Sequence, residues 1–304
     1  MAEAEMVPLP ELSAEQSQRA RRAAETAATG QLAPLSAPPT APKAQSAQSG
    51  DVSPLEVNDA ERWGRAGSAP AITTGRLFVV NNDGQGMQCT ASVINAENRN
   101  TLWTAGHCVH PGGEGEDAYY DVGTMAFAPD DDDGQAPHGL WEATYVNTTT
   151  GWQDEEDYQY DLAAVEVSPQ AANGNLQEFT GAQGFRFGYG QDFSEVTFLG
   201  YPGAGNGRDF PSDELYYCQD DTEDASIWYW DERLQMVCDM GQGSSGGPWI
   251  DDLNSSGGGY IIGTMSHIDD TDPNVPDDEW EDEHVWSSDH GDGAINVYND
   301  VSQH

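Results

Sequence analysis

Short apolar runs recur along the chain from about residue 73. The clearest of them cover residues 77–80, 90–94, 101–105, 162–167, 196–199 and 260–265. They are four to six residues long and often rich in β-branched side chains, with Gly, Asn and Asp between them. Runs of this length between turn signals are typical of strands. We therefore predict an all-β barrel or sandwich architecture, with a single helix near the C-terminus over residues 293–299.

The first 65 residues follow a different pattern. Ser13 and Gln16 form a capping signal at the start of residues 12–28, whose Ala, Glu, Arg and Gln predict one short helix. Residues 31–50 are rich in Ala, Pro, Ser and Gln and offer little apolar area to offset the cost of ordering. This composition predicts an extended or disordered linker.

No export signal is legible in this leading stretch. Arg21 and Arg22 resemble a twin-arginine signal, but the residues after them are polar and interrupted by proline. We expect residues 1–70 to be a propeptide or flexible leader, and the active protein to begin near residues 60–75.

The charge of the chain narrows the classes of function that it can have. There are 53 Asp and Glu against 11 Lys and Arg, a formal net charge of -42. Residues 1–65 hold only nine of the acids, so the excess lies in the folded part. Such a surface repels phosphate, which excludes non-specific nucleic-acid binding, and no apolar run is long enough for a membrane helix. Molar salt shortens the Debye length to roughly 3 Å and removes most of the self-repulsion, so we interpret the composition as adaptation to high salt.

Four cysteines fall in two close pairs, at Cys89 and Cys108 and at Cys218 and Cys238. Four cysteines allow three disulfide pairings, and the spacing alone does not select one. Disulfides would place the protein outside the cytosol. Buried thiols or a zinc site are the weaker alternatives, because no Cys-x-x-Cys spacing occurs.

Residues 243–248 read Gly-Ser-Ser-Gly-Gly-Pro and carry the strongest chemical signal. Glycines around Ser245 allow the backbone to approach a substrate carbonyl, and the Gly243 and Ser245 amides are placed to stabilise an oxyanion. A serine hydroxyl is a poor nucleophile by itself. It needs a neighbouring base, and that base needs an orienting carboxylate.

Two other segments supply such partners. Residues 104–108 read Thr-Ala-Gly-His-Cys, and residues 160–165 read Tyr-Asp-Leu-Ala-Ala-Val. Singly, His107 is explained as a satisfied polar residue, Asp161 as a turn residue and Ser245 as part of a glycine-rich turn. Together and in this order they form a specific signal.

The three segments resemble the chymotrypsin-fold, trypsin-like serine peptidases. That family carries Thr-Ala-Ala/Gly-His-Cys, Asp-Leu/Ile-Ala and Gly-x-Ser-Gly-Gly-Pro in this chain order. The sequence is most similar to the secreted bacterial branch that includes the glutamyl-endopeptidase-like enzymes. The resemblance covers roughly residues 72–300.

The resemblance implies a role for each matching residue. His107 would be the general base, Asp161 its orienting acid and Ser245 the nucleophile, with the Gly243 amide completing the oxyanion hole beside the Ser245 amide. Disulfides would join Cys89 to Cys108 and Cys218 to Cys238.

It also implies two six-stranded antiparallel β-barrels with the active site in the cleft between them. We assign residues 71–175 to the N-terminal barrel and residues 176–304 to the C-terminal barrel. The pancreatic-type members have an aspartate before the nucleophile that pairs with a newly cut N-terminus. Ser244 stands there in this chain, so activation by such an ion pair is not expected.

Two preferences for the substrate's P1 residue stay open. Asp239 lies six residues before the nucleophile, where trypsin carries the acid that selects Arg or Lys. The glutamyl enzymes instead share a pocket histidine, and the matching position here is Met265, followed by Ser266 and His267. His267 is equally open to interpretation as a plain surface histidine.

We conclude from the sequence that the protein is a secreted, salt-adapted serine endopeptidase acting as a monomer on peptides or proteins. Its chemistry requires no metal or organic cofactor, and nucleic acid and membrane are not expected partners. One alternative is a non-catalytic binding protein on a protease scaffold. The other, an α/β-hydrolase esterase with a Gly-x-Ser-x-Gly elbow, needs a helix after Ser245, which the following Gly-Gly-Pro disfavours.

Overall fold

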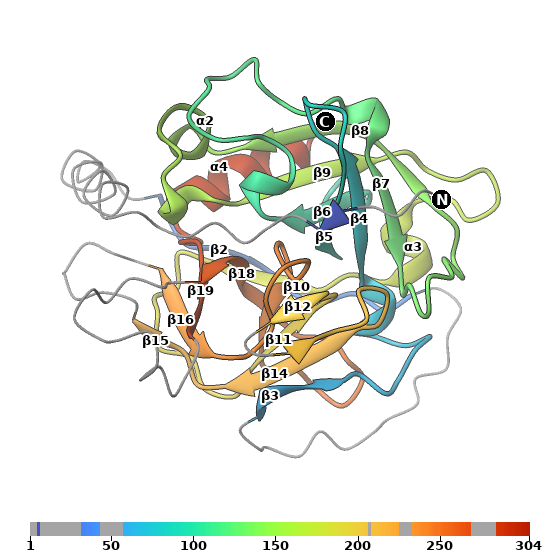
Figure 1. Ribbon diagram of the computed structural model, residues 1–304, viewed down its shortest axis with the longest axis vertical. Helices are drawn as coiled ribbons and strands as arrows, with labels where there is room; N and C mark the ends of the chain where they lie inside the picture. Colours follow the sequence, from blue (N-terminus) through green and yellow to red (C-terminus); the bar gives the residue numbers. More distant parts are fainter. Residues whose placement is uncertain (1–4, 7–31, 43–56, 206–207, 225–232, 269–283) are drawn as a thin grey trace.

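The computed structural model describes residues 5–6, 32–42, 57–205, 208–224, 233–268 and 284–304. The helix expected over residues 12–28 lies outside these residues. Strands dominate the described chain, and Figure 1 shows them gathered into two bodies, one drawn mainly in green and the other mainly in yellow and orange.

The first body is a closed barrel of six antiparallel strands. Their order around the barrel is β5-β4-β7-β8-β9-β6, and β6 pairs back with β5. The strands are β4 (Thr74–Val80), β5 (Gly86–Val93), β6 (Thr101–Thr104), β7 (Ala126–Pro129), β8 (Trp141–Thr148) and β9 (Ala163–Val167). A short strand, β1 (Glu5–Met6), pairs in parallel with β5.

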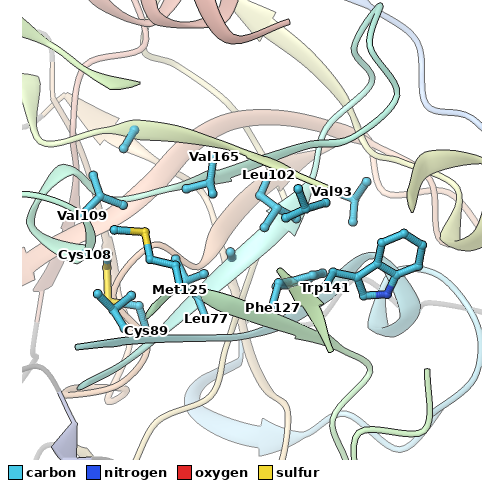
Figure 2. Close-up of a cluster of buried hydrophobic side chains, with 14 of the residues drawn as sticks. Leu77, Cys89, Val93, Leu102, Cys108, Val109, Met125, Phe127, Trp141 and Val165 are labelled. Carbon is cyan, nitrogen blue, oxygen red and sulfur yellow. A yellow bond between two sulfur atoms is a disulfide. The ribbon is translucent and has the colours of Figure 1, made fainter. Parts of the chain in front are cut away.

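Apolar side chains fill this barrel. Figure 2 shows Leu77, Phe127, Trp141 and Val165 converging on its interior, and all four are fully buried or nearly so. The Cys89–Cys108 disulfide (S–S 2.03 Å) lies at the edge of the cluster. The observed strands β4, β5, β6 and β9 confirm the first four apolar runs as strands.

The second body is a curled sheet in the order β15-β16-β19-β18-β17-β11-β14-β3. Its strands are β3 (Val57–Arg62), β11 (Val196–Gly200), β14 (Tyr216–Asp220), β15 (Glu223–Asp224), β16 (Leu234–Val237), β17 (Pro248–Asp251), β18 (Tyr260–Ile268) and β19 (His284–Ser287). A separate hairpin joins β12 (Ala204–Gly205) to β13 (Arg208–Asp209). Strands β11 and β18 confirm the remaining two apolar runs.

A disulfide closes this second barrel. Six strands of this sheet run in order from β16 to β14, so these two are the outer strands of the six. Cys218 lies on β14, and Cys238 directly follows β16. The bond between them (S–S 2.08 Å) joins the two outer strands, which are not paired by a β-ladder in the described chain. The fold is therefore the predicted pair of six-stranded barrels, and both implied disulfides are present.

Two parts of the leading 70 residues pair with the second sheet. Strand β3 pairs antiparallel with β14, and β2 (Leu35–Ala37) pairs antiparallel with β10 (Gly184–Phe187), which itself lies parallel to β18. A Cβ on Gly184 would lie 2.4 Å from the carbonyl oxygen of Ala37, so the close approach of β2 requires glycine at this position.

The helices are short. They are α2 (Thr150–Glu155), α3 (Leu176–Thr180) and α4 (Asp292–Val301), with 3₁₀ turns η1 (Ala71–Thr73), η2 (Gly106–Cys108), η3 (Val122–Thr124) and η4 (Tyr158–Tyr160). Helix α4 confirms the predicted C-terminal helix and returns to the first barrel, where it packs on β8 and β9. No helix in the described ranges is long and apolar enough to cross a membrane.

His290 connects the two barrels just before α4. Its Nε2 accepts a hydrogen bond from Trp103 Nε1 on β6 (2.9 Å) and lies 3.1 Å from Thr264 Oγ1 on β18. Its Nδ1 donates to the carbonyl oxygen of Ser288 (3.0 Å). Since Nε2 faces an indole donor, a second proton on this ring would replace a hydrogen bond by a repulsive contact.

We expect His290 to make the fold acid-sensitive. Burial lowers the pKa of His290 to about 4, against about 6.5 in an unfolded chain. The unfolded chain therefore binds this proton first, and stability present above pH 6.5 is lost as the pH falls to 4, by about 3 kcal/mol. Urea unfolding of wild type and His290→Gln in molar KCl at pH 7 and pH 4 measures the difference. Equal losses in the two proteins would contradict it, and His304→Gln, at an exposed position, is the control.

Candidate active site

His107 and Asp161 form a buried hydrogen-bonded pair in the first barrel. His107 Nδ1 lies 2.8 Å from Asp161 Oδ2, and the His107 backbone amide donates to Asp161 Oδ1 (2.8 Å). The Asp161 side chain is fully buried, and that of His107 is 8% exposed. Because a carboxylate only accepts, the ring hydrogen of a neutral His107 lies on Nδ1, which leaves Nε2 as a base.

The local structure holds both side chains in place. His107 lies in the 3₁₀ turn η2 directly after β6, and the next residue, Cys108, is tied to β5 through Cys89. Asp161 ends the turn η4 directly before β9. Since β6 and β9 pair in the barrel, the end of β6 lies beside the start of β9. This brings the imidazole and the carboxylate together.

Ser245 comes from the second barrel but is anchored on the first. Its carbonyl oxygen accepts a hydrogen bond from the Thr90 amide on β5 (2.8 Å). Gly246 follows at φ 79°, and a Cβ there would lie 2.1 Å from Thr104 Oγ1 and 2.9 Å from the Ala105 amide nitrogen. Only glycine permits this approach, which places the serine beside the strand that leads to His107.

The structure assembles the His–Asp half of the site and leaves the Ser–His hydrogen bond unmade. Ser245 Oγ and His107 Nε2 are both buried, and neither has a hydrogen-bond partner within the described chain. Hydrogen bonds between nucleophile and base are often long or misaligned before substrate binds. The two orphaned atoms are complementary, because one offers a hydroxyl hydrogen and the other a lone pair.

Two backbone amides remain available next to the serine. Gly243 has φ 94°, which favours glycine, and its carbonyl oxygen accepts from Thr90 Oγ1 (2.9 Å). Within the described residues the amides of Gly243 and Ser245 donate to no other group. Free, preorganised donors of this kind stabilise a developing oxyanion. The intervening Ser244 is buried and donates through Oγ to the Gly241 carbonyl (2.6 Å), so its side chain is satisfied within the loop.

Asp239 is committed to structural contacts. Its Oδ1 accepts from the Ala60 amide on β3 (2.7 Å), and its Oδ2 lies 3.2 Å from Arg208 Nε. Burial raises the pKa of this carboxyl, although these two partners oppose the shift. The carboxylate that was one candidate for recognising a basic P1 residue is therefore already occupied by β3 and Arg208.

Met265, Ser266 and His267 lie on β18 and are all fully buried. Ser266 Oγ donates to Asp161 Oδ2 (2.6 Å), so it supports the carboxylate directly. His267 is not a surface histidine, because its Nδ1 lies 2.9 Å from Ser266 Oγ and its Nε2 lies 2.9 Å from Arg233 NH1.

Sequence reasoning missed Thr90 and Arg233. No signal distinguishes Thr90 beyond its place directly after Cys89. Arg233 did have a sequence signal, because it is one of only five Lys and Arg residues beyond residue 65 in a chain of net charge -42. A buried cation in such a chain marks a position that needs positive charge.

The described residues do not fit a metal centre. Two groups have ligand atoms close enough for an ion, Cys89 with His107 and Cys108, and Cys218 with Cys238 and Asp239. In each group both cysteines are joined in a disulfide, which has no thiolate to offer a metal.

The chain matches a protein-family model and, over a short stretch, a curated protein. The family model described as "Trypsin-like peptidase domain" matches residues 89–256, which contain His107, Asp161 and Ser245. Among curated proteins, the chain is 30% identical over 85 residues to "Extracellular metalloprotease" of Bacillus subtilis (strain 168). The match covers 28% of this chain and 25% of that protein, so the chain spans about a quarter of its length.

Solved structures match over most of the chain. The protease Anisep from Arthrobacter nicotinovorans is 25% identical, with a TM-score of 0.65 over 78% of this chain and 98% of its own. A thermostable serine protease, AL20, from an extremophilic microorganism is 26% identical, with a TM-score of 0.64 over 77% and 98%. A Glu endopeptidase, at 16% identity and a TM-score of 0.58 over 81% and 97%, shares the fold.

Proposed function

Because this chain belongs to the family of trypsin-like peptidase domains, we propose that it is a serine endopeptidase that works through an acyl-enzyme intermediate. The observation that carries the serine mechanism is the buried His107–Asp161 pair, in which His107 Nε2 has no hydrogen-bond partner, just as Ser245 Oγ has none.

In this mechanism Ser245 Oγ attacks the peptide carbonyl while His107 Nε2 accepts its proton. The carbonyl oxygen, now negative, is stabilised by the amides of Gly243 and Ser245. His107 then protonates the leaving amine, and the acyl-enzyme is hydrolysed by a water that His107 activates in turn. Asp161 keeps the imidazole in the correct tautomer and stabilises the imidazolium that forms at each step.

The direct test is covalent labelling by a fluorophosphonate in molar KCl. We expect one modified residue, Ser245, identified by peptide mass spectrometry. A Ser245→Ala form should remain unlabelled, whereas Ser255→Ala, at an exposed serine, should be labelled like wild type. Absence of labelling in the folded wild-type protein would favour the alternative, a non-catalytic binding protein on a protease scaffold.

We further propose that the enzyme acts outside the cell. Disulfides persist in oxidising compartments, and here the Cys218–Cys238 bond closes the second barrel. The curated relative from Bacillus subtilis is described as extracellular, which supports the same location.

Adaptation to high salt completes the proposal. The described chain contains seven arginines and no lysine, and five of these arginines already form ion pairs with carboxylates. Most of the 53 acids therefore have no cationic side chain to pair with. Their mutual repulsion is screened over roughly 10 Å at 0.1 M salt but over roughly 3 Å at 1 M.

We expect dialysis from molar KCl to 0.1 M KCl to abolish both the near-UV circular dichroism signal and the activity, because unscreened repulsion expands the fold. Sucrose at matched osmolality separates screening from general solvent exclusion. It should fail to restore the signal, and recovery in sucrose equal to that in KCl would argue against charge repulsion as the cause.

A further inference from the structure

We propose that Arg233 and His267 are positioning residues of the catalytic triad, which act through Ser266 to fix the direction of the hydrogen bonds that reach Asp161. The inference rests on the proposed serine mechanism and extends it to two residues that touch neither the nucleophile nor the reacting atoms.

The four side chains form one continuous line of hydrogen bonds that begins in the second barrel and ends at Asp161 in the first. Arg233 NH1 lies 2.9 Å from His267 Nε2, and His267 Nδ1 lies 2.9 Å from Ser266 Oγ. Ser266 Oγ in turn lies 2.6 Å from Asp161 Oδ2. Ser266, His267 and Asp161 are fully buried and Arg233 is 7% exposed, so bulk water does not compete for these contacts.

The chemistry of arginine sets the direction of the whole line. A guanidinium group has only donors and stays protonated, so His267 Nε2 must accept. The single hydrogen of a neutral His267 then lies on Nδ1 and is donated to Ser266 Oγ. With that oxygen occupied as an acceptor, the one hydroxyl hydrogen of Ser266 is directed to Asp161.

Asp161 Oδ2 consequently receives two donors, Ser266 Oγ and His107 Nδ1, while its Oδ1 receives the His107 amide. Without Arg233, His267 gains a second tautomer in which Nδ1 accepts. Ser266 would then divide its hydrogen between His267 and Asp161. A carboxylate with fewer donors attracts a neighbouring imidazolium more strongly, so the reactive form of His107 would appear only at higher pH.

The groups around His267 keep its imidazole ring neutral. Tyr158 lies against its ring (centroids 4.9 Å apart), and Trp286 stacks at 5.8 Å. Burial raises the pKa of Tyr158, with the charge of Asp161 adding to the shift, so this phenol stays neutral. Burial, followed by the charge of Arg233, holds the pKa of His267 well below its usual range. His267 thus remains a neutral relay.

The test is the pH dependence of the rate of fluorophosphonate labelling in molar KCl, which needs no knowledge of the preferred peptide. We expect Arg233→Met to move the acid limb upward by about half a pH unit, which slows labelling by about threefold at pH values well below the limb and by less at higher pH. Arg233→Lys retains a cationic donor and should bring the acid limb most of the way back to its wild-type position. Arg99→Met, which removes an exposed arginine paired with Glu178, is the matched control and should leave the acid limb unchanged.

A double variant tests the route through Ser266. If Arg233 acts along this line, Arg233→Met should shift the acid limb no further in a Ser266→Ala background than Ser266→Ala does alone. Additive shifts, or an acid limb in Arg233→Met that coincides with wild type, would overturn the proposal. A purely structural role of Arg233 would lower stability without moving the limb.

A measurement on the unmodified protein covers the case in which Arg233→Met fails to fold. Nitrogen-15 chemical shifts of labelled histidine report which ring nitrogen carries the hydrogen, and His267→Asn assigns the signals. We expect the hydrogen of His267 on Nδ1 at every pH from 5 to 9, whereas a hydrogen on Nε2 would refute the proposed order.

Wild-type protein that is never labelled at Ser245 would reject the serine mechanism itself, and normal labelling with an unmoved acid limb would reject the positioning role alone.

Discussion

Replacing Ser245 by alanine is expected to lower kcat by about 10⁶, the largest effect of any single substitution in this chain. The change removes one oxygen atom from a buried position and leaves its surroundings intact, since the Thr90 amide bonds the backbone carbonyl of Ser245 and not its side chain. The protein should therefore fold and bind peptides while it fails to form the acyl-enzyme. Hydrolysis of a peptide library in molar KCl, compared with wild type at equal near-UV circular dichroism, measures the loss.

Ser255→Ala serves as the matched control, because this serine lies exposed in the turn after β17. It should retain wild-type activity. If Ser245→Ala kept more than about a hundredth of wild-type kcat, another group would have to be the nucleophile, and the role assigned to His107 would need revision with it.

Asp161→Asn is expected to lower kcat by about 10⁴, the usual cost of replacing the carboxylate of a Ser-His-Asp triad by an amide. Both oxygens of Asp161 accept hydrogen bonds, Oδ1 from the His107 amide and Oδ2 from His107 Nδ1 and Ser266. An amide has one acceptor oxygen, and its other end is an NH₂ group that only donates, so this NH₂ must face one of these donors. Turned toward Nδ1, it forces the hydrogen of His107 onto Nε2, the atom that has to accept the serine proton.

The activity of this variant should rise with pH more steeply than that of wild type, as hydroxide replaces His107 Nε2 as the base that accepts the serine proton. Asp154→Asn, at an exposed position of α2, changes the same charge without touching His107 and should leave kcat unchanged. Equal losses in the two variants would assign the effect to net charge, not to the tautomer of His107.

The strands were predictable because their signal is local. Each apolar run, such as residues 77–80 or 260–265, supplies its own pattern, and the buried faces of β4 and β18 follow it. Pairing between strands that are distant in the chain produces no such local pattern in the sequence. The partnership of β3 with β14, and of β2 with β10, depends on backbone edges and not on a motif, so residues 1–70 were predicted as a propeptide or flexible leader and no strand was predicted among them.

The residues of the site also divide into those that the sequence predicted and those that it did not. The residue types and order of His107, Asp161 and Ser245 pointed to their meeting place, and the structure brings the first two into hydrogen-bond contact. The partners behind them were not predictable. Ser266 was expected in a substrate pocket, and its hydrogen bond to Asp161 was not foreseen, because the direction in which a β18 side chain points depends on register, which the sequence pattern does not specify.

The pairing of β3 with β14 has a consequence for any trimming of the leader. A cut after Arg62 would strip this strand away and leave the N–H and C=O groups of β14 bare along one side, a template on which another chain adds itself. The same cut would withdraw the Ala60 amide from Asp239. A long-lived product of maturation should therefore start at or before Val57, and not near residues 60–75 as the sequence suggested, and shorter forms should be recovered as aggregates.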